Sequence, residues 1–122
     1  MNVKKEVRNG EVAVLYSPGY GAGWSTWSSD PVEREKLMFD PSIVYMVEQM
    51  HNIPEELDWQ THVNQWMSNI SEYMEANYPH FYDGGVEDLC IAWLPEGTEF
   101  RIDEYDGSET IELKQKMPWV IA

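Results

Sequence analysis

The sequence predicts an α+β fold in which helices pack on one face of a mainly antiparallel sheet. Three observations support this class. An Asn-Gly pair at 9–10 lies between two extended segments, Asp-Pro pairs at 30–31 and 40–41 mark helix starts, and short apolar runs separated by turn residues fill the chain after residue 85. The expected order is strand, strand, helix, helix, helix, strand, strand, strand.

The first two strands are predicted from the turn between them. Asn9 and Gly10 both accept the positive φ angles of a type I′ turn, which makes this pair a strong hairpin signal. Residues 12–16 are all apolar, which suits a strand covered on both faces.

The three helices are predicted from their first residues. Asp30 and Asp40 each place a capping carboxylate before a proline, so helices are expected over about 31–37 and from Pro41 to about Met50. A third helix is expected to open at Pro54 and to end near Asn77, before Pro79. Its apolar residues recur at helical spacing: Leu57, Val63, Trp66, Met67, Ile70, Tyr73 and Met74.

The last third of the chain is predicted to form three strands. Residues 89–94 are an apolar run, 95–98 a turn, and a strand from Phe100 turns at Asp106-Gly107 into a partner strand containing Ile111 and Leu113. The chain shows no internal repeat or linker, so residues 1–122 are expected to form a single domain.

Composition limits the possible functions. The chain has 122 residues and a net charge of −14, which repels nucleic acid and anionic membranes and attracts basic proteins. Its apolar stretches are shorter than the ~20 residues of a membrane span, and no apolar signal region follows the first residues, so a soluble cytoplasmic protein is expected. Cys90 is the single cysteine, which excludes an internal disulfide and a thiolate zinc site.

A segment of alternating glycines and aromatics at 16–27 is the clearest candidate for ligand contact. Glycines allow backbone N–H groups to approach a ligand, and aromatic rings can stack on it. The spacing matches neither the dinucleotide fingerprint nor a phosphate loop. The expected ligand-binding residues are Tyr16, Gly19, Tyr20, Gly21, Gly23, Trp24, Trp27 and Arg101. The structural alternative is a loop whose tryptophans cover the core.

Catalytic patterns are weak. His51, His62 and His80 are scattered, with no spacing typical of metal ligands. The acidic residues of the last hairpin (Asp103, Glu104, Asp106 and Glu109) have the chemistry for acid–base catalysis or for binding a divalent ion, but a solvated hairpin tip is the better interpretation, because alternation sends neighbours to opposite faces. Hydroxyl side chains at Ser25, Thr26 and Ser28 lack a nucleophile elbow. No catalytic residue, metal or cofactor is therefore assigned, and a small hydrolase ranks third among the functions.

Three blocks of the sequence resemble a group of uncharacterised small phage and prophage proteins. They begin at Val12 (VAVLYSPGYGAGW), Phe39 (FDPSIV) and Phe100 (FRIDEYDGSE). The resemblance implies an accessory protein that acts inside the host cell as an inhibitor, decoy or sequestering protein against bacterial immunity. It transfers no activity to individual residues.

Two functional hypotheses follow. The first is a non-enzymatic counter-defence protein that binds and sequesters a small nucleotide-type immune signal through the 16–27 segment, with Arg101 meeting a phosphate. The alternative is an acidic mimic of nucleic acid, comparable to an anti-CRISPR protein, that inhibits a basic host effector through Glu72, Glu75, Asp103 and Glu104. An antiparallel sheet with exposed tryptophans favours a homodimer.

Overall fold

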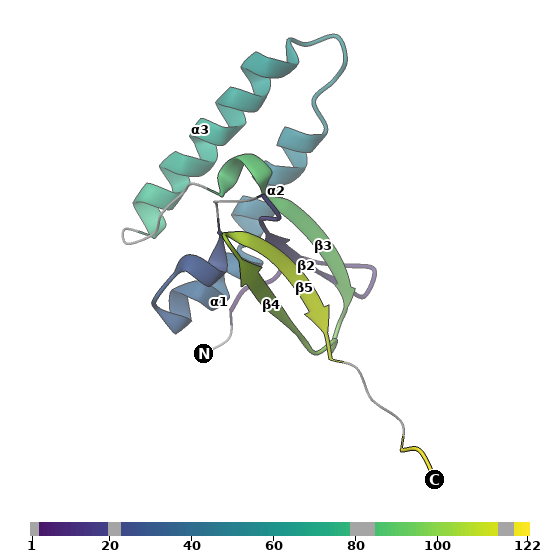
Figure 1. Cartoon of the computed structure of the whole chain (residues 1–122). Helices are drawn as coiled ribbons and strands as arrows, with labels where there is room; N and C mark the ends of the chain where they lie inside the picture. Colours follow the sequence, from purple (N-terminus) through teal and green to yellow (C-terminus); the bar gives the residue numbers. More distant parts are fainter. Residues whose placement is uncertain (1–2, 20–22, 79–84, 115–118) are drawn as a thin grey trace.

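Two strands open the chain, as the Asn-Gly turn predicts. The computed structural model describes residues 3–19, 23–78, 85–114 and 119–122 (Figure 1). Strands β1 (Val7–Arg8) and β2 (Glu11–Tyr16) are antiparallel, and the turn between them has φ angles of 51° at Asn9 and 78° at Gly10. Strand β2 also pairs with β3 (Cys90–Pro95), which gives a three-stranded sheet in the order β1-β2-β3.

The last two strands form a sheet of their own. Strands β4 (Phe100–Tyr105) and β5 (Ser108–Leu113) are joined by a turn at Asp106 and Gly107, with φ angles of 48° and 85°. The sequence predicts one sheet, whereas the described strands form two. The β4–β5 ribbon is tied to the first sheet just beyond the end of β2, where the Glu109 N–H donates to the Ser17 carbonyl oxygen at 2.8 Å.

The first two helices begin where the Asp-Pro pairs predict. Helix α1 (Pro31–Phe39) is capped by the Asp30 carboxylate, which accepts from the Val32 N–H at 3.0 Å. Helix α2 (Pro41–His51) is capped by Asp40, which accepts from the Ser42 N–H at 2.9 Å. The buried Asp40 side chain also accepts hydrogen bonds from two tyrosine hydroxyls, at 2.8 Å from Tyr73 and 2.6 Å from Tyr78, and therefore connects the α1–α2 junction to α3.

Helix α3 (Trp59–Asn77) starts later than the sequence predicts. Pro54 opens a turn instead, in which the Leu57 N–H donates to the Pro54 carbonyl oxygen at 3.1 Å, and the helix begins only after Asp58. Proline followed by acidic residues is favourable both in the first turn of a helix and in a β-turn. These residue types therefore do not distinguish a helix start from a turn. The end at Asn77 is confirmed.

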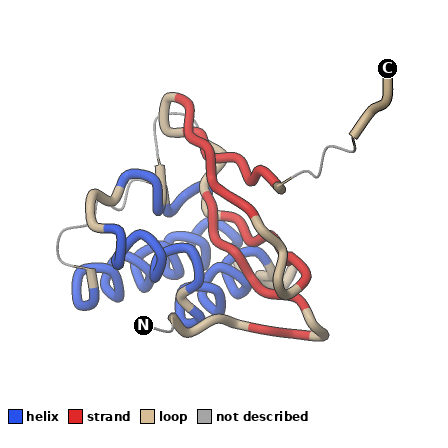
Figure 2. The backbone as a smooth tube through the Cα atoms, turned by 90° about the horizontal axis from the view of Figure 1, so that it is seen from below, coloured by secondary structure: helices blue, strands red, loops and turns tan. Residues whose placement is uncertain are grey.

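The core lies between the helices and the first sheet. Figure 2 shows the helices gathered on one side of the strands. The predicted α+β class and the order of the elements are confirmed. The core combines residues of β2, the 16–27 segment, all three helices, the residue after α3 and the segment before β3: Ala13, Leu15, Trp24, Leu37, Ile43, Val44, Val47, Ile70, Met74, Tyr78, Val86 and Leu89. None of the helices in the described ranges is both long and apolar enough to cross a bilayer.

Candidate functional site

Trp24, the expected stacking residue, lies in the core. Its side chain is 0% exposed, and its indole N–H donates to the Leu37 carbonyl oxygen of α1 at 2.8 Å. The expectation that this ring faces outward is wrong, because the loop turns Trp24 inward beneath α1. Trp27 differs, since it is 43% exposed in the short helix η1 (Ser25–Trp27). The loop thus covers the core with Trp24 and leaves Trp27 partly exposed to solvent.

A buried carboxylate holds this loop in place. Glu109 of β5 is 0% exposed, and its two oxygens accept from the backbone N–H groups of Ser17 at 2.9 Å, Trp24 at 2.9 Å and Thr26 at 3.0 Å. The Thr26 hydroxyl donates to the same carboxylate. Four donors replace the water that a buried charge loses, so the ion is stabilised in the interior and fixes both ends of the loop.

The alternation of residues in the last strand indicates that Glu109 is buried. Alternation places Glu109, Ile111 and Leu113 on one face of the last strand, and Ile111 is partly buried. A carboxylate on the inward face of a strand needs hydrogen-bond donors, and the 16–27 segment supplies them. The solvated hairpin tip predicted for the acidic residues is therefore wrong for Glu109.

The described glycines of the segment approach other parts of the protein. A Cβ atom on Gly19 would collide with the Asp88 side chain, and one on Gly23 with the Trp27 ring. A Cβ on Gly85 would strike the backbone carbonyl of Gly23. Gly19 and Gly23 are thus required for internal packing, which accounts for them without a ligand. Tyr20 and Gly21, together with His80, lie outside the described residues.

Tyr16, at the end of β2, is half-buried, and burial raises the pKa of its hydroxyl. The phenol therefore stays protonated well above neutral pH.

A cleft of about 460 Å³ lies beside the loop, between α1, η1 and β4. We call it the arginine cleft. It is lined by Ser25, Thr26, Pro31, Arg34, Glu35, Met38, Phe39, Phe100, Arg101 and Ile102. The rings of Phe39 and Phe100 meet edge to face, with centroids 6.1 Å apart. Among the expected site residues, Arg101 lines this cleft.

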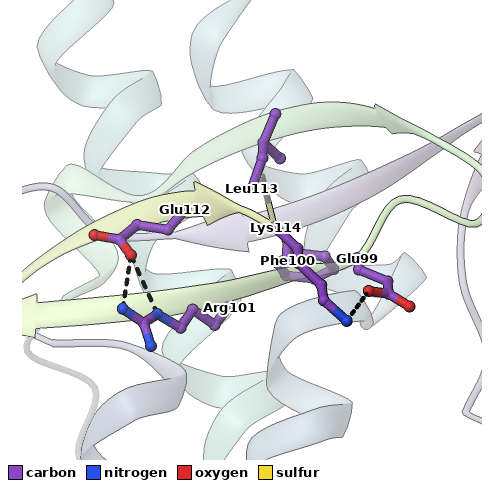
Figure 3. Close-up of a pocket in the computed structure, with 6 residues that line it drawn as sticks. All are labelled: Glu99, Phe100, Arg101, Glu112, Leu113 and Lys114. Atoms are coloured by element: carbon purple, nitrogen blue, oxygen red, sulfur yellow. Dashed lines mark hydrogen bonds and ion pairs between the residues drawn. The ribbon is translucent and has the colours of Figure 1, made fainter. Parts of the chain in front are cut away.

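The two arginines of the cleft are oriented by different partners. Arg34 donates from Nη2 and Nε to the Ser28 carbonyl oxygen at 2.6 and 3.1 Å. Arg101 donates to the Glu112 carboxylate at 2.9 and 3.1 Å (Figure 3). It also lies 3.2 Å from an Asp103 oxygen, and the hydrogen bonds to Glu112, followed by the charge of Asp103, raise the pKa of Arg101. Both guanidinium groups retain N–H donors beyond these bonds, since each has five.

Ser25 adds an unsatisfied polar group to the cleft. The residue is 0% exposed, and its hydroxyl oxygen has no hydrogen-bond partner within the described parts of the chain. Buried hydroxyls are normally paired, so Ser25 is an exception in the wall of the cleft.

The acidic residues of the alternative hypothesis do not form one patch. Glu72 and Glu75 are exposed on α3, whereas Asp103 and Glu104 belong to β4 of the second sheet. Glu104 is also engaged, because it accepts from the Gly107 N–H at 2.6 Å and from the Trp27 indole at 3.3 Å.

The described residues offer little support for a metal site or for a hydroxyl nucleophile. No group of three or more His, Cys, Asp or Glu side chains there is arranged to hold a metal ion. The Thr26 hydroxyl is occupied by Glu109, and that of Ser28 by the Asp30 carbonyl oxygen. Comparisons with protein-family models, curated proteins and solved structures found no match to this chain, so the site is interpreted from its geometry.

Proposed function

We propose that the arginine cleft binds a small anionic ligand carrying an aromatic ring, a nucleotide-type signal, and that the protein sequesters it. One observation supports this most. Arg34 of α1 and Arg101 of β4 line a single cleft together with the Phe39–Phe100 pair, in a chain that has only 8 Lys and Arg residues against 22 Asp and Glu.

The chemistry of the lining fits such a ligand. Guanidinium groups donate pairs of hydrogen bonds to phosphate oxygens. Arg34 lines the cleft from α1, and the exposed Arg101 side chain, which leaves β4 on the face opposite Phe100 and Ile102, would reach the phosphate from the edge of the cleft. Met38, Phe100 and Ile102 supply apolar surface for a ring. A volume of about 460 Å³ lies within the ~300–1,000 Å³ typical of small-molecule sites.

The proposal keeps the class of ligand expected from the sequence and changes the residues that contact it. Trp24, Gly19 and Gly23 become the scaffold, and Arg101 remains a contact. We propose sequestration rather than turnover, in keeping with the function expected from the sequence. A counter-defence role would follow from withdrawing an immune signal.

Calorimetry with defined probes tests the proposal. The probes are a cyclic dinucleotide, a nucleoside monophosphate and the uncharged nucleoside. Binding should require the phosphate, and Arg34→Gln or Arg101→Gln should weaken it by roughly tenfold or more, as expected for a lost charge-assisted contact.

Arg8→Gln is the matched control. Arg8 also pairs with a carboxylate, that of Glu48 at 2.7 Å, but it lies outside the cleft. Equal affinity for the nucleoside and the nucleotides, or an equal loss in all three variants, would contradict the proposal. Absence of binding by every probe would contradict it as well.

An acidic inhibitor of a basic effector is the second candidate. It is supported by the net charge of −14 and by the exposure of Glu72 and Glu75 on α3. Its distinguishing test is the combined Glu72→Gln, Glu75→Gln, Asp103→Asn and Glu104→Gln variant, which should weaken effector binding and its salt dependence without loss of nucleotide binding.

A further inference from the structure

A second cleft of about 460 Å³ lies between α2, α3 and the short helix η2 (Val86–Asp88). We call it the methionine groove. It is lined by Met50, His51, Trp59, Gln60, Val63, Asn64, Met67, Glu87 and Asp88. Trp59, Val63 and Met67 follow one another at four-residue spacing and therefore share a face of α3. Met50 of α2 is almost fully buried in the wall of the groove.

This groove exposes large apolar side chains. Trp59 is 61% exposed. Val63 and Met67 are half-buried. A tryptophan in water beside methionines is typical of a protein contact site, since its burial by a partner is strongly favourable.

The border of the groove is acidic. Glu87 and Asp88 are exposed, and neither carboxylate forms an ion pair with a described residue. None of the described lining residues is Lys or Arg. Glu55, Glu56 and Asp58 lead into Trp59 and are also exposed. Negative charge around an apolar surface attracts a partner that combines apolar and basic side chains.

We propose that the methionine groove binds a basic amphipathic helix of a partner protein. The apolar face of that helix would lie on Trp59, Val63 and Met67, and its Lys or Arg residues would face Glu87 and Asp88. Methionine side chains adapt to different apolar shapes, as they do in other grooves that accept helices. The proposal is independent of the arginine cleft, because the two sets of lining residues share no member.

Fluorescence anisotropy with a labelled peptide tests the groove. The peptide has about 18 residues, five helical turns, with leucines on one face and lysines on the other. A peptide of the same composition in scrambled order serves as the first control. The ordered peptide should bind roughly tenfold more tightly than the scrambled one, because only it presents an apolar face.

Two charge-matched double variants locate the interaction. Glu87→Gln with Asp88→Asn should weaken binding about fivefold and reduce its salt dependence, whereas Glu72→Gln with Glu75→Gln should change it less than twofold. Equal effects of the two pairs, or equal binding of both peptides, would show attraction by net charge alone and overturn the proposal.

Trp59→Ala should weaken peptide binding by tenfold or more while the unfolding midpoint stays close to wild type, since the ring is mostly exposed. If the peptide does not bind and Trp59→Ala instead converts a dimer to a monomer in sedimentation, a second copy occupies the groove and the proposal is wrong.

Discussion

The arginine cleft and the methionine groove have the same size and opposite chemistry. Each encloses about 460 Å³. The first is lined by Arg34 and Arg101, and the second by Glu87 and Asp88 without a described Lys or Arg. A chain with a net charge of −14 therefore does not present a uniform surface. The net charge determines which partners the whole protein attracts, whereas the side chains that line each cleft determine what that cleft binds.

The two clefts also differ in how they are built. The methionine groove draws three of its apolar residues from one helical face, so local periodicity produces most of it. The arginine cleft requires η1, α1 and β4 to meet, and η1 is held by hydrogen bonds from Thr26 to Glu109. Changes at the Glu109 cluster should consequently affect the first cleft and spare the second.

The largest expected effect is on stability, from Trp24→Ala. Removal of this fully buried ring and of its hydrogen bond to Leu37 should lower the free energy of unfolding by about 3–5 kcal/mol. Urea denaturation measures it. Trp59→Ala in the methionine groove is the matched control and should cost less than about 1 kcal/mol. Similar losses in both variants would remove the distinction between a core tryptophan and a contact tryptophan.

Glu109→Gln should have the next largest effect. The amide keeps one acceptor oxygen but places an NH₂ group against backbone N–H donors. The free energy of unfolding should therefore fall by about 2–3 kcal/mol. Nucleotide binding in the arginine cleft should weaken, and peptide binding in the methionine groove should persist. Glu112→Gln, an exposed neighbour on β5, controls for the lost charge. Parallel loss of both binding activities would mean that the clefts are not independently supported.

The smallest expected effect concerns pH and the arginine cleft. The pKa of Asp103 is raised, first by a hydrogen bond to Glu112, while the pKa of Glu112 is lowered by the same bond. As the pH falls through the raised pKa, Asp103 becomes neutral before Glu112 does and stops competing for Arg101. Affinity for a cyclic dinucleotide, whose phosphodiesters keep their charge, should then rise roughly two- to threefold, as expected for an exposed pair.

Asp103→Asn checks this assignment. The variant should bind more tightly at neutral pH and lose the increase on acidification, in calorimetry across the pH range. An unchanged pH profile would assign the response to another group. Peptide binding in the methionine groove should be the same for Asp103→Asn and for the wild type.

The turns and helix starts that the sequence determined depend on interactions between residues close together in the chain. The turns at Asn9-Gly10 and Asp106-Gly107, and the helix starts at Asp30 and Asp40, each depend on groups within four residues of one another. These signals set the elements and their order, and with them the fold class. The helix start assigned to Pro54 failed because a proline with acidic neighbours also forms a turn.

Only the tertiary structure decided which residues serve as scaffold and which remain available for contact. Glu109 binds the Ser17 N–H across 92 positions of sequence, so no local pattern connects the two. The same folding turns Trp24 inward, leaves Trp27 and Trp59 exposed, and brings Arg34 and Arg101 to the lining of one cleft. A glycine or a tryptophan in a loop has the same composition whether it touches the core or a ligand. The difference arises from the packing of distant segments, which sequence proximity does not encode.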